Sequence, residues 1–156
     1  MELLARCALP EGAGVSFASA GIHGFVDQPI DEVVAAALPR NVDASSFRSR
    51  TLTRDLVAGA NLVLTAEVAH RRFILDDQPI LFRKVVTLAQ AAGAVRRAGP
   101  GLSRADVLAR IASARGHAHP ADDVPDPYGR GPEAAAEMVR RVHDLLDEIL
   151  PALERE

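Results

Sequence analysis

The stretch whose residue types are best suited to catalysis is Asp126-Pro127-Tyr128-Gly129, which sets a carboxyl group beside an aromatic ring. Pro125 and Pro127 restrict the backbone on both sides of Asp126, so a rigid loop would present the carboxyl. Such a carboxyl could act as a general acid towards a leaving group, while Tyr128 stacks on an aromatic substrate. The same four residues also fit a type I turn from Asp126 to Gly129, and a turn alone would explain them.

A second polar group, His117-Ala118-His119 with Asp122 and Asp123, has the side chains that zinc or manganese prefers. We interpret it as a solvated polar loop, and we expect neither a metal nor a cofactor. The paired arginines of the chain are interpreted as solvated helix faces rather than as a phosphate-binding track.

Two glycine-containing motifs are incomplete. The Gly-Ala-Gly at residues 12–14 begins a dinucleotide-binding fingerprint, but Phe17 stands at the third glycine position, so we expect only a turn. A nucleophile elbow around Ser16 would need a glycine where Ala18 stands, and Ser16 lies inside a predicted strand. The sequence therefore lacks a complete motif for dinucleotide binding or serine hydrolysis.

Apolar patterning predicts strands that alternate with helices. Strands are predicted at Val15–Ala20, Asn61–Thr65 and Lys84–Thr87, and helices at Met1–Leu9, Asp31–Leu38, Leu52–Gly59, Glu67–Leu75, Leu88–Arg97, Ser103–Ala114 and from Pro132 onward. The last helix carries a continuous apolar stripe formed by Met138, Val139, Val142, Leu145, Leu146, Ile149, Leu150 and Leu153. The alternation predicts an α/β fold, with a parallel sheet flanked by helices, in one domain over residues 1–156.

The composition excludes several classes of protein. The chain has 156 residues, of which 48% are hydrophobic and 25% charged, and its net charge of -3 argues against a basic nucleic-acid binder. A single cysteine leaves no intramolecular disulfide, and no apolar run is long enough to span a bilayer. We expect a bacterial, cytoplasmic protein with no nucleic-acid partner and no membrane insertion.

Several segments, in this order, resemble the low-molecular-weight protein tyrosine phosphatases. They are Ser19-Ala20-Gly21, Pro29-Ile30-Asp31, the basic turn from Phe47 to Thr53, the strand Ala60-Asn61-Leu62-Val63-Leu64-Thr65 and the acid loop Val124-Pro125-Asp126-Pro127-Tyr128-Gly129. The resemblance covers essentially the whole chain and is strongest to the arginine-rich actinobacterial members. It implies the family's fold, a three-layer sandwich of helices around a parallel sheet.

The resemblance also implies a reaction. In the family, a cysteine thiolate in a Cys-x-x-x-x-x-Arg loop attacks the phosphoryl group of phosphotyrosine and forms a cysteinyl phosphate. The acid-loop aspartate, here Asp126, protonates the leaving tyrosyl oxygen and then activates water. Tyr128 and Phe25 would contact the substrate ring, and the partner would be a phosphotyrosine-containing protein.

The chain departs from the family at the nucleophile. Met1-Glu2-Leu3-Leu4 matches the start of the helix that follows the family's phosphate loop, so the first strand and the loop are missing. Cys7 does not replace the nucleophile, because Ala13 rather than an arginine stands six residues on. We interpret Cys7 as a small core residue. The polypeptide as written is therefore expected not to hydrolyse phosphotyrosine.

The missing strand has a structural consequence. In the family it lies inside the sheet, so its loss opens a gap between the strands predicted at Val15–Ala20 and Asn61–Thr65. Unpaired backbone groups there cost about 1–3 kcal/mol each when they are buried, and self-association through the exposed gap would satisfy them.

Three hypotheses follow: a phosphatase whose start codon is assigned too late, a non-catalytic phosphatase-like interaction module, and an arsenate reductase of the same fold. The single cysteine argues against the third, because such enzymes resolve their thiol–arsenate adduct with further thiols.

Overall fold

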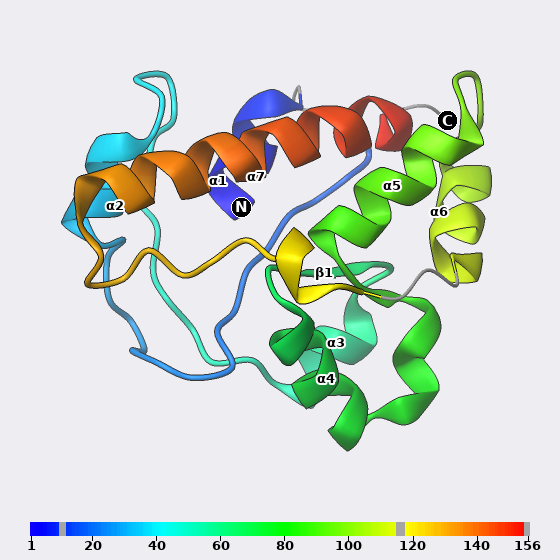
Figure 1. The fold of residues 1–156 in the computed structure, drawn as a ribbon, viewed down its shortest axis with the longest axis horizontal. Coiled ribbons are helices and arrows are strands. Elements are labelled where there is room, and N and C mark those ends of the chain that lie inside the picture. Colours follow the sequence, from blue (N-terminus) through cyan, green and yellow to red (C-terminus); the bar gives the residue numbers. More distant parts are fainter. Residues whose placement is uncertain (10–11, 115–117, 155–156) are drawn as a thin grey trace.

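The computed structural model describes residues 1–9, 12–114 and 118–154. The helices are α1 (Glu2–Ala8), α2 (Glu32–Ala37), α3 (Arg54–Gly59), α4 (Val68–Asp77), α5 (Leu88–Ala98), α6 (Arg104–Ser113) and α7 (Gly131–Leu153). The strands are β1 (Val63–Thr65) and β2 (Val85–Thr87), and two short 3₁₀ helices, η1 (Pro79–Arg83) and η2 (Pro120–Asp122), lie in the connections. Figure 1 shows α7 crossing one side of the molecule, with α3 and α4 on the opposite side.

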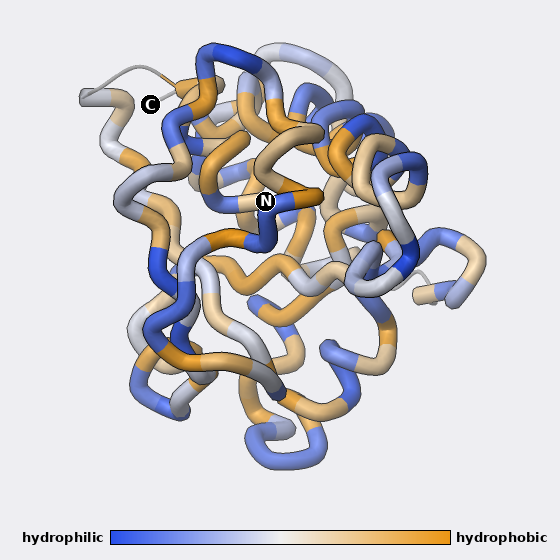
Figure 2. The backbone as a smooth tube through the Cα atoms, turned by 90° about the vertical axis from the view of Figure 1, so that its left-hand side faces the viewer, coloured by the Kyte–Doolittle hydropathy of each residue, from blue (hydrophilic) through white to orange (hydrophobic). Residues whose placement is uncertain are grey.

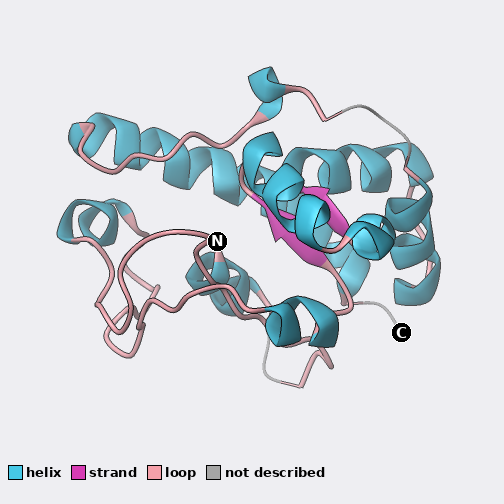
Figure 3. Ribbon diagram, turned by 90° about the horizontal axis from the view of Figure 1, so that it is seen from below, coloured by secondary structure: helices cyan, strands magenta, loops and turns pink. Residues whose placement is uncertain are grey.

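The sheet of the described chain has two parallel strands, β1 and β2, in the register Val63↔Val85 to Thr65↔Thr87. All three residues of β2 are buried, as expected of a strand covered on both faces. Figure 3 shows the sheet surrounded by helices. The α/β class with a parallel sheet flanked by helices is confirmed.

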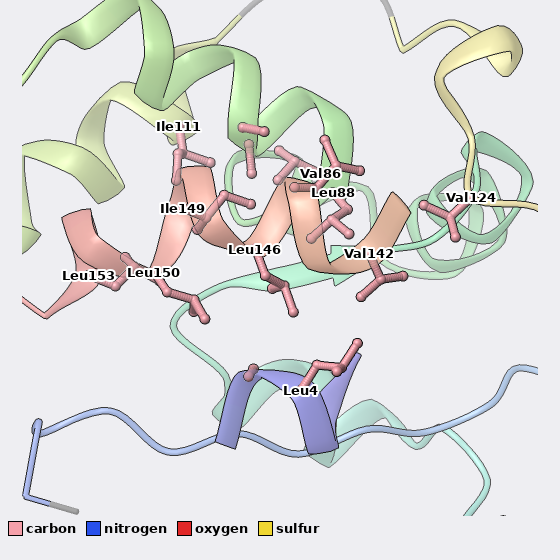
Figure 4. Close-up of a cluster of buried hydrophobic side chains, with 14 of the residues drawn as sticks. Leu4, Val86, Leu88, Ile111, Val124, Val142, Leu146, Ile149, Leu150 and Leu153 are labelled. Atoms are coloured by element: carbon pink, nitrogen blue, oxygen red, sulfur yellow. The ribbon is translucent and has the colours of Figure 1, made fainter. Parts of the chain in front are cut away.

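The core forms around the apolar stripe of α7. Seven of the eight stripe residues are buried, and Met138 is half-buried. Figure 4 shows α7 between α5 and α1, with Leu4 of α1 pointing towards it. Ile149 and Val142 are completely inaccessible to solvent, so α7 is the element around which the apolar side chains pack.

Side chains fix the start of most helices. Asp31 accepts the amides of Val33 and Val34 at 3.0 Å, so the Pro-Ile-Asp segment begins α2 with an N-cap. Thr53 caps α3, Ser103 caps α6, and Thr87 forms a capping box with Gln90 at the start of α5.

The prediction of a strand over Val15–Ala20 is wrong. This segment is extended, but its amides donate to no backbone carbonyl within the described chain. The carbonyl of Phe17 accepts instead from the Arg6 side chain at 2.9 Å, and that of Ser19 accepts from Arg50 at 2.7 Å. Extended backbone counts as a strand only when a neighbouring strand pairs with it, and no such neighbour is present among the described residues.

The other side of the expected gap is the free flank of β1. Val63 donates its amide to Lys84, so its backbone faces β2. Backbone groups of a parallel ladder alternate in direction, and Leu64 therefore turns its N–H and C=O away from β2. No strand of the described chain pairs with that flank.

The hydropathy of the chain varies between its interior and its outer turns. Figure 2 shows hydrophilic stretches gathered at the outer turns of the chain. None of the helices in the described ranges combines the length and the apolar character needed to cross a membrane.

Candidate functional site

The acid loop is anchored at the carboxyl end of β1. Val124 is buried and donates its amide to the carbonyl of Ala66, the residue that follows β1, at 3.0 Å. Asp123 accepts the amide of Val68 at 2.9 Å and so satisfies a free N–H in the first turn of α4. Two adjacent residues thus fasten the loop to the edge at which parallel α/β sheets bind their ligands.

Asp126 itself stands on the surface. Its Oδ1 accepts the amide of Tyr128 at 3.0 Å, which makes a small Asx turn. The backbone turn is closed by Arg130 donating to the carbonyl of Pro127, one residue later than the turn expected from Asp126 to Gly129. Gly129 has φ 70°, the left-handed conformation that the third residue of such a turn often needs. The expected type I turn over Asp126–Gly129 is therefore wrong in its position.

Two aromatic residues proposed as substrate contacts lie together, although 102 residues separate them in the sequence. The ring centroids of Phe25 and Tyr128 are 6.4 Å apart, with the ring planes inclined by 53°. Phe25 is 67% exposed and Tyr128 64% exposed, so most of both rings is open to a ligand. The structure brings both rings next to the turn that carries Asp126.

The same surface extends to two residues that the sequence analysis misses. His23 contacts Phe73 of α4 edge to face, with ring centroids 5.6 Å apart. His23 and Phe25 are alternate residues of one loop, so the two ring pairs are linked through the chain. We call His23, Phe25, Phe73 and Tyr128 the aromatic rim. An aromatic residue on the outer face of α4, away from its buried Ile74, is the signal that could have revealed Phe73.

Gly21 sets the course of the loop that carries His23 and Phe25. It forms an isolated parallel bridge with Thr51, and a Cβ at this position would lie 2.9 Å from the carbonyl oxygen of His23. A side chain there would force the backbone to shift, so the Ser-Ala-Gly motif ends in the one residue that this bend accepts.

The interpretation of Cys7 as a core residue is wrong. The thiol is exposed, and its sulfur accepts from the Asn41 side chain at 3.1 Å and donates to the Asn41 carbonyl at 3.6 Å. The apolar face of α1 is formed instead by Leu4 and Ala5. Both of these contacts are with Asn41 and neither joins Cys7 to the acid loop, so they do not set the thiol as a nucleophile beside Asp126.

The polar group considered as a metal site has other partners. His119 accepts the Ala121 amide through Nδ1 at 3.1 Å, and Asp123 is occupied with α4. His117 lies outside the described residues. Within the described ranges, no three histidine, cysteine or acidic side chains gather closely enough to hold a metal ion.

The site thus combines an exposed carboxyl group, with one oxygen engaged by an amide, and a rim of four exposed rings. This arrangement can flank a flat substrate and exchange a proton with it, but none of the described residues that form it carries a thiol. Comparison of the chain with protein families, curated proteins and solved structures finds no match.

Proposed function

We propose that this chain carries the general-acid part of a phosphotyrosine phosphatase of the low-molecular-weight type, built on that family's three-layer sandwich. The observation that carries the proposal is the acid loop, in which Asp126 stands exposed at the carboxyl end of β1 beside Phe25 and Tyr128. A phosphotyrosine ring lying on the exposed faces of these two side chains would set its ester oxygen near the carboxyl group.

The free flank of β1 supports the same proposal. Leu64 offers unpaired backbone groups on this flank, while the extended residues 15–20 lack a ladder partner in the described chain. A strand added to β1 would satisfy those groups and would end, like β1, at the edge where Asp126 stands. A phosphate-binding loop after that strand would complete the site.

The proposed chemistry assigns one proton to Asp126. A cysteine thiolate of the added loop attacks phosphorus, the P–O bond to tyrosine breaks, and the protonated Asp126 gives its proton to the departing oxygen. The resulting aspartate then takes a proton from the water that cleaves the cysteinyl phosphate. Phe25 and Tyr128 hold the aromatic leaving group during the first step.

The first test uses p-nitrophenyl phosphate. The chain as written should give no turnover above buffer, because it brings no thiolate to the acid loop. Joining the family segment Val-Cys-x-x-Asn-x-Cys-Arg-Ser-Pro to Met1, preceded by a short apolar strand, should restore hydrolysis. A matched graft should remain inactive when serine replaces the first cysteine of this segment, the one six positions before its arginine.

The second test isolates the acid. In the active graft, Asp126→Ala should lower kcat for a phenyl phosphate by about 10²–10⁴-fold, while Asp122→Ala, in the same connection, should leave it unchanged. A graft that folds and binds phosphate but never turns over would contradict the proposal. Equal rates for the two variants would remove Asp126 from its role.

A non-catalytic interaction module is the second candidate, and the exposure of the aromatic rim favours it. Large exposed rings are enriched where proteins bind partners. This candidate requires the chain from Met1 onward to be a well-folded monomer. A molten near-UV circular dichroism spectrum would argue against it, and restored turnover in the graft would favour the phosphatase.

A further inference from the structure

A second surface feature, independent of Asp126 and the aromatic rim, is a groove between α4, η1 and α6 above β2. Its volume is about 430 Å³, within the range of about 300–1,000 Å³ that small-molecule sites occupy. Neither Asp126 nor any residue of the aromatic rim lines it. The groove therefore needs an explanation separate from the phosphatase proposal.

The floor of the groove is apolar. Val86 of β2 and Ile111 of α6 are almost completely buried and form its base, and Leu75 of α4 is half-buried beside them. Phe82 of η1 stands at the rim with 47% of its surface exposed. The apolar surface still open to a ligand therefore belongs mainly to Leu75 and Phe82, and covering it favours a ligand with a compact apolar body.

The polar side chains of the groove are unevenly charged. Arg71 and Arg72 line it, whereas Asp76 is the one carboxylate among its described lining residues. A further cation, Arg83, lies over the Phe82 ring with its guanidinium carbon 5.7 Å from the centroid. The local balance of charge is positive and would attract an anion.

Arg71 is already oriented. Its Nε donates to the carbonyl of Val85 at 2.9 Å, and the side chain is half-buried. The two terminal nitrogens of the guanidinium have no partner among the described residues. A guanidinium held through Nε presents those nitrogens as a fixed fork, the geometry that binds a carboxylate, sulfonate or phosphate with two parallel hydrogen bonds.

We propose that this groove binds a small amphipathic anion, with the apolar body on Leu75 and Phe82 above the buried Val86 and Ile111, and the acidic group on Arg71 and Arg72. The apolar floor alone would accept any oily molecule, and the arginines alone would accept any anion. Their combination selects molecules that carry both parts.

The test titrates the protein with naphthalene-2-sulfonate and follows backbone amides by NMR. Saturable shifts should centre on Leu75, Val86 and Ile111. Inorganic sulfate, which lacks the apolar body, and 2-naphthol, which lacks the acidic group, should each bind at least tenfold more weakly. Equal binding of either part alone, or shifts confined to the aromatic rim, would overturn the proposal.

Substitutions in the groove test which side chains bind the probe. Arg71→Ala should weaken binding of naphthalene-2-sulfonate at least tenfold, and Arg71→Lys should recover only part of the loss, because lysine keeps the charge but not the fork. Ala112→Phe, which fills the groove, should abolish binding. Arg140→Ala, on the exposed face of α7, is the matched control and should change nothing.

Since Arg71 also holds the carbonyl of Val85, its loss could disturb β2. Arg72→Ala removes an exposed groove arginine without that contact, and it should weaken binding severalfold with an unchanged amide spectrum elsewhere. Unaltered affinity in both Arg72→Ala and Ala112→Phe would refute the groove as the site.

Discussion

Residues 12–53 and the chain from Arg54 onward are organised in different ways. No residue of the first region is fully buried, and its one helix, α2, has no buried side chain. Apart from Leu4 and Ala5, every buried apolar residue of the described chain lies at or after Val57. The first region covers the core with half-buried side chains such as Val15 and Phe17, whereas the second region builds it.

The two regions also satisfy their backbones differently. In the second region, most backbone N–H and C=O groups are satisfied by hydrogen bonds within helices and between β1 and β2. The caps at Thr87 and Ser103 satisfy free amides at the starts of α5 and α6. In the first region, isolated backbone bonds between loop segments, such as Asp27 to Ser49, replace the ladder. Its residues 15–20 rely on side chains, because Arg6 of α1 and Arg50 bind the carbonyls of Phe17 and Ser19. Long side chains lose conformational entropy when they are held in this way, so they stabilise extended backbone less than a paired strand does.

The largest expected contrast is in hydrogen exchange. Amides of residues 15–20 should exchange orders of magnitude faster than those in the centre of α7, because only the latter require opening of the core. Mass spectrometry of peptides from the two segments measures both rates. Equal protection would mean that residues 15–20 are paired in solution, through self-association if the protection depends on protein concentration.

A matched pair of substitutions tests where the core lies. Val142→Ala removes two methyl groups from a completely buried position and should lower the free energy of unfolding by about 2 kcal/mol. Val15→Ala makes the same chemical change in the half-buried segment and should cost less than half as much. Urea unfolding gives both values, and equal costs would erase the distinction between the regions.

Two helix caps give a smaller contrast. Ser103→Ala removes the oxygen that accepts the Asp106 amide at the start of α6 and should cost about 1 kcal/mol in global unfolding. Asp31→Ala removes the corresponding cap of α2, but α2 buries no side chain and can fray locally. Its effect on the urea midpoint should therefore be smaller, and a larger effect would make α2 part of the cooperative core.

The smallest expected effect is a dependence on pH within the second region. The hydrogen-bonded Arg54 guanidinium lowers the pKa of Asp77 below its ordinary value of 3.8. A carboxyl whose pKa is lower in the folded state stabilises the fold above its ordinary pKa, and this stabilisation is lost as the pH falls through the lowered value. Both side chains are well exposed, so solvent screens the interaction and the effect should be slight.

Asp77→Asn measures this contribution. When the pH is lowered from about 7 to about 3, the urea midpoint of unfolding should fall slightly less in this variant than in the parent chain. Asp76→Asn, one residue away, is the control. The interpretation fails if Asp77→Asn leaves the acid sensitivity unchanged or increases it.

Much of the fold could be predicted because its signals are local. The stripe of α7 repeats at helical spacing, so the buried residues from Val139 to Leu153 follow from a single amphipathic pattern. The apolar runs that become β1 and β2 are bounded by polar residues, and this pattern predicts both strands. The start of α7 is predicted at Pro132 and observed at Gly131, a difference of one residue.

The candidate site was only partly predictable. Asp126 and Tyr128 belong to one short motif, and Phe25 entered through the family resemblance. His23 and Phe73 were missed because no spacing rule links a loop residue to a helix residue that far along the chain. The exposure of Cys7 was misjudged because Leu4 and Ala5 already fill the buried face of its short helix.

By itself, the sequence determined which segments become helices, which residues of α7 turn inward, and which loop carries the carboxyl group of Asp126. These properties depend on neighbours within about one or two helical turns. Only the tertiary structure decided that β1 pairs with β2, while residues 15–20 have no strand partner among the described residues. It also decided that the ring of Phe25 contacts that of Tyr128. An alternating pattern specifies which face of an extended segment is buried, but the partner of its backbone depends on where the rest of the chain lies.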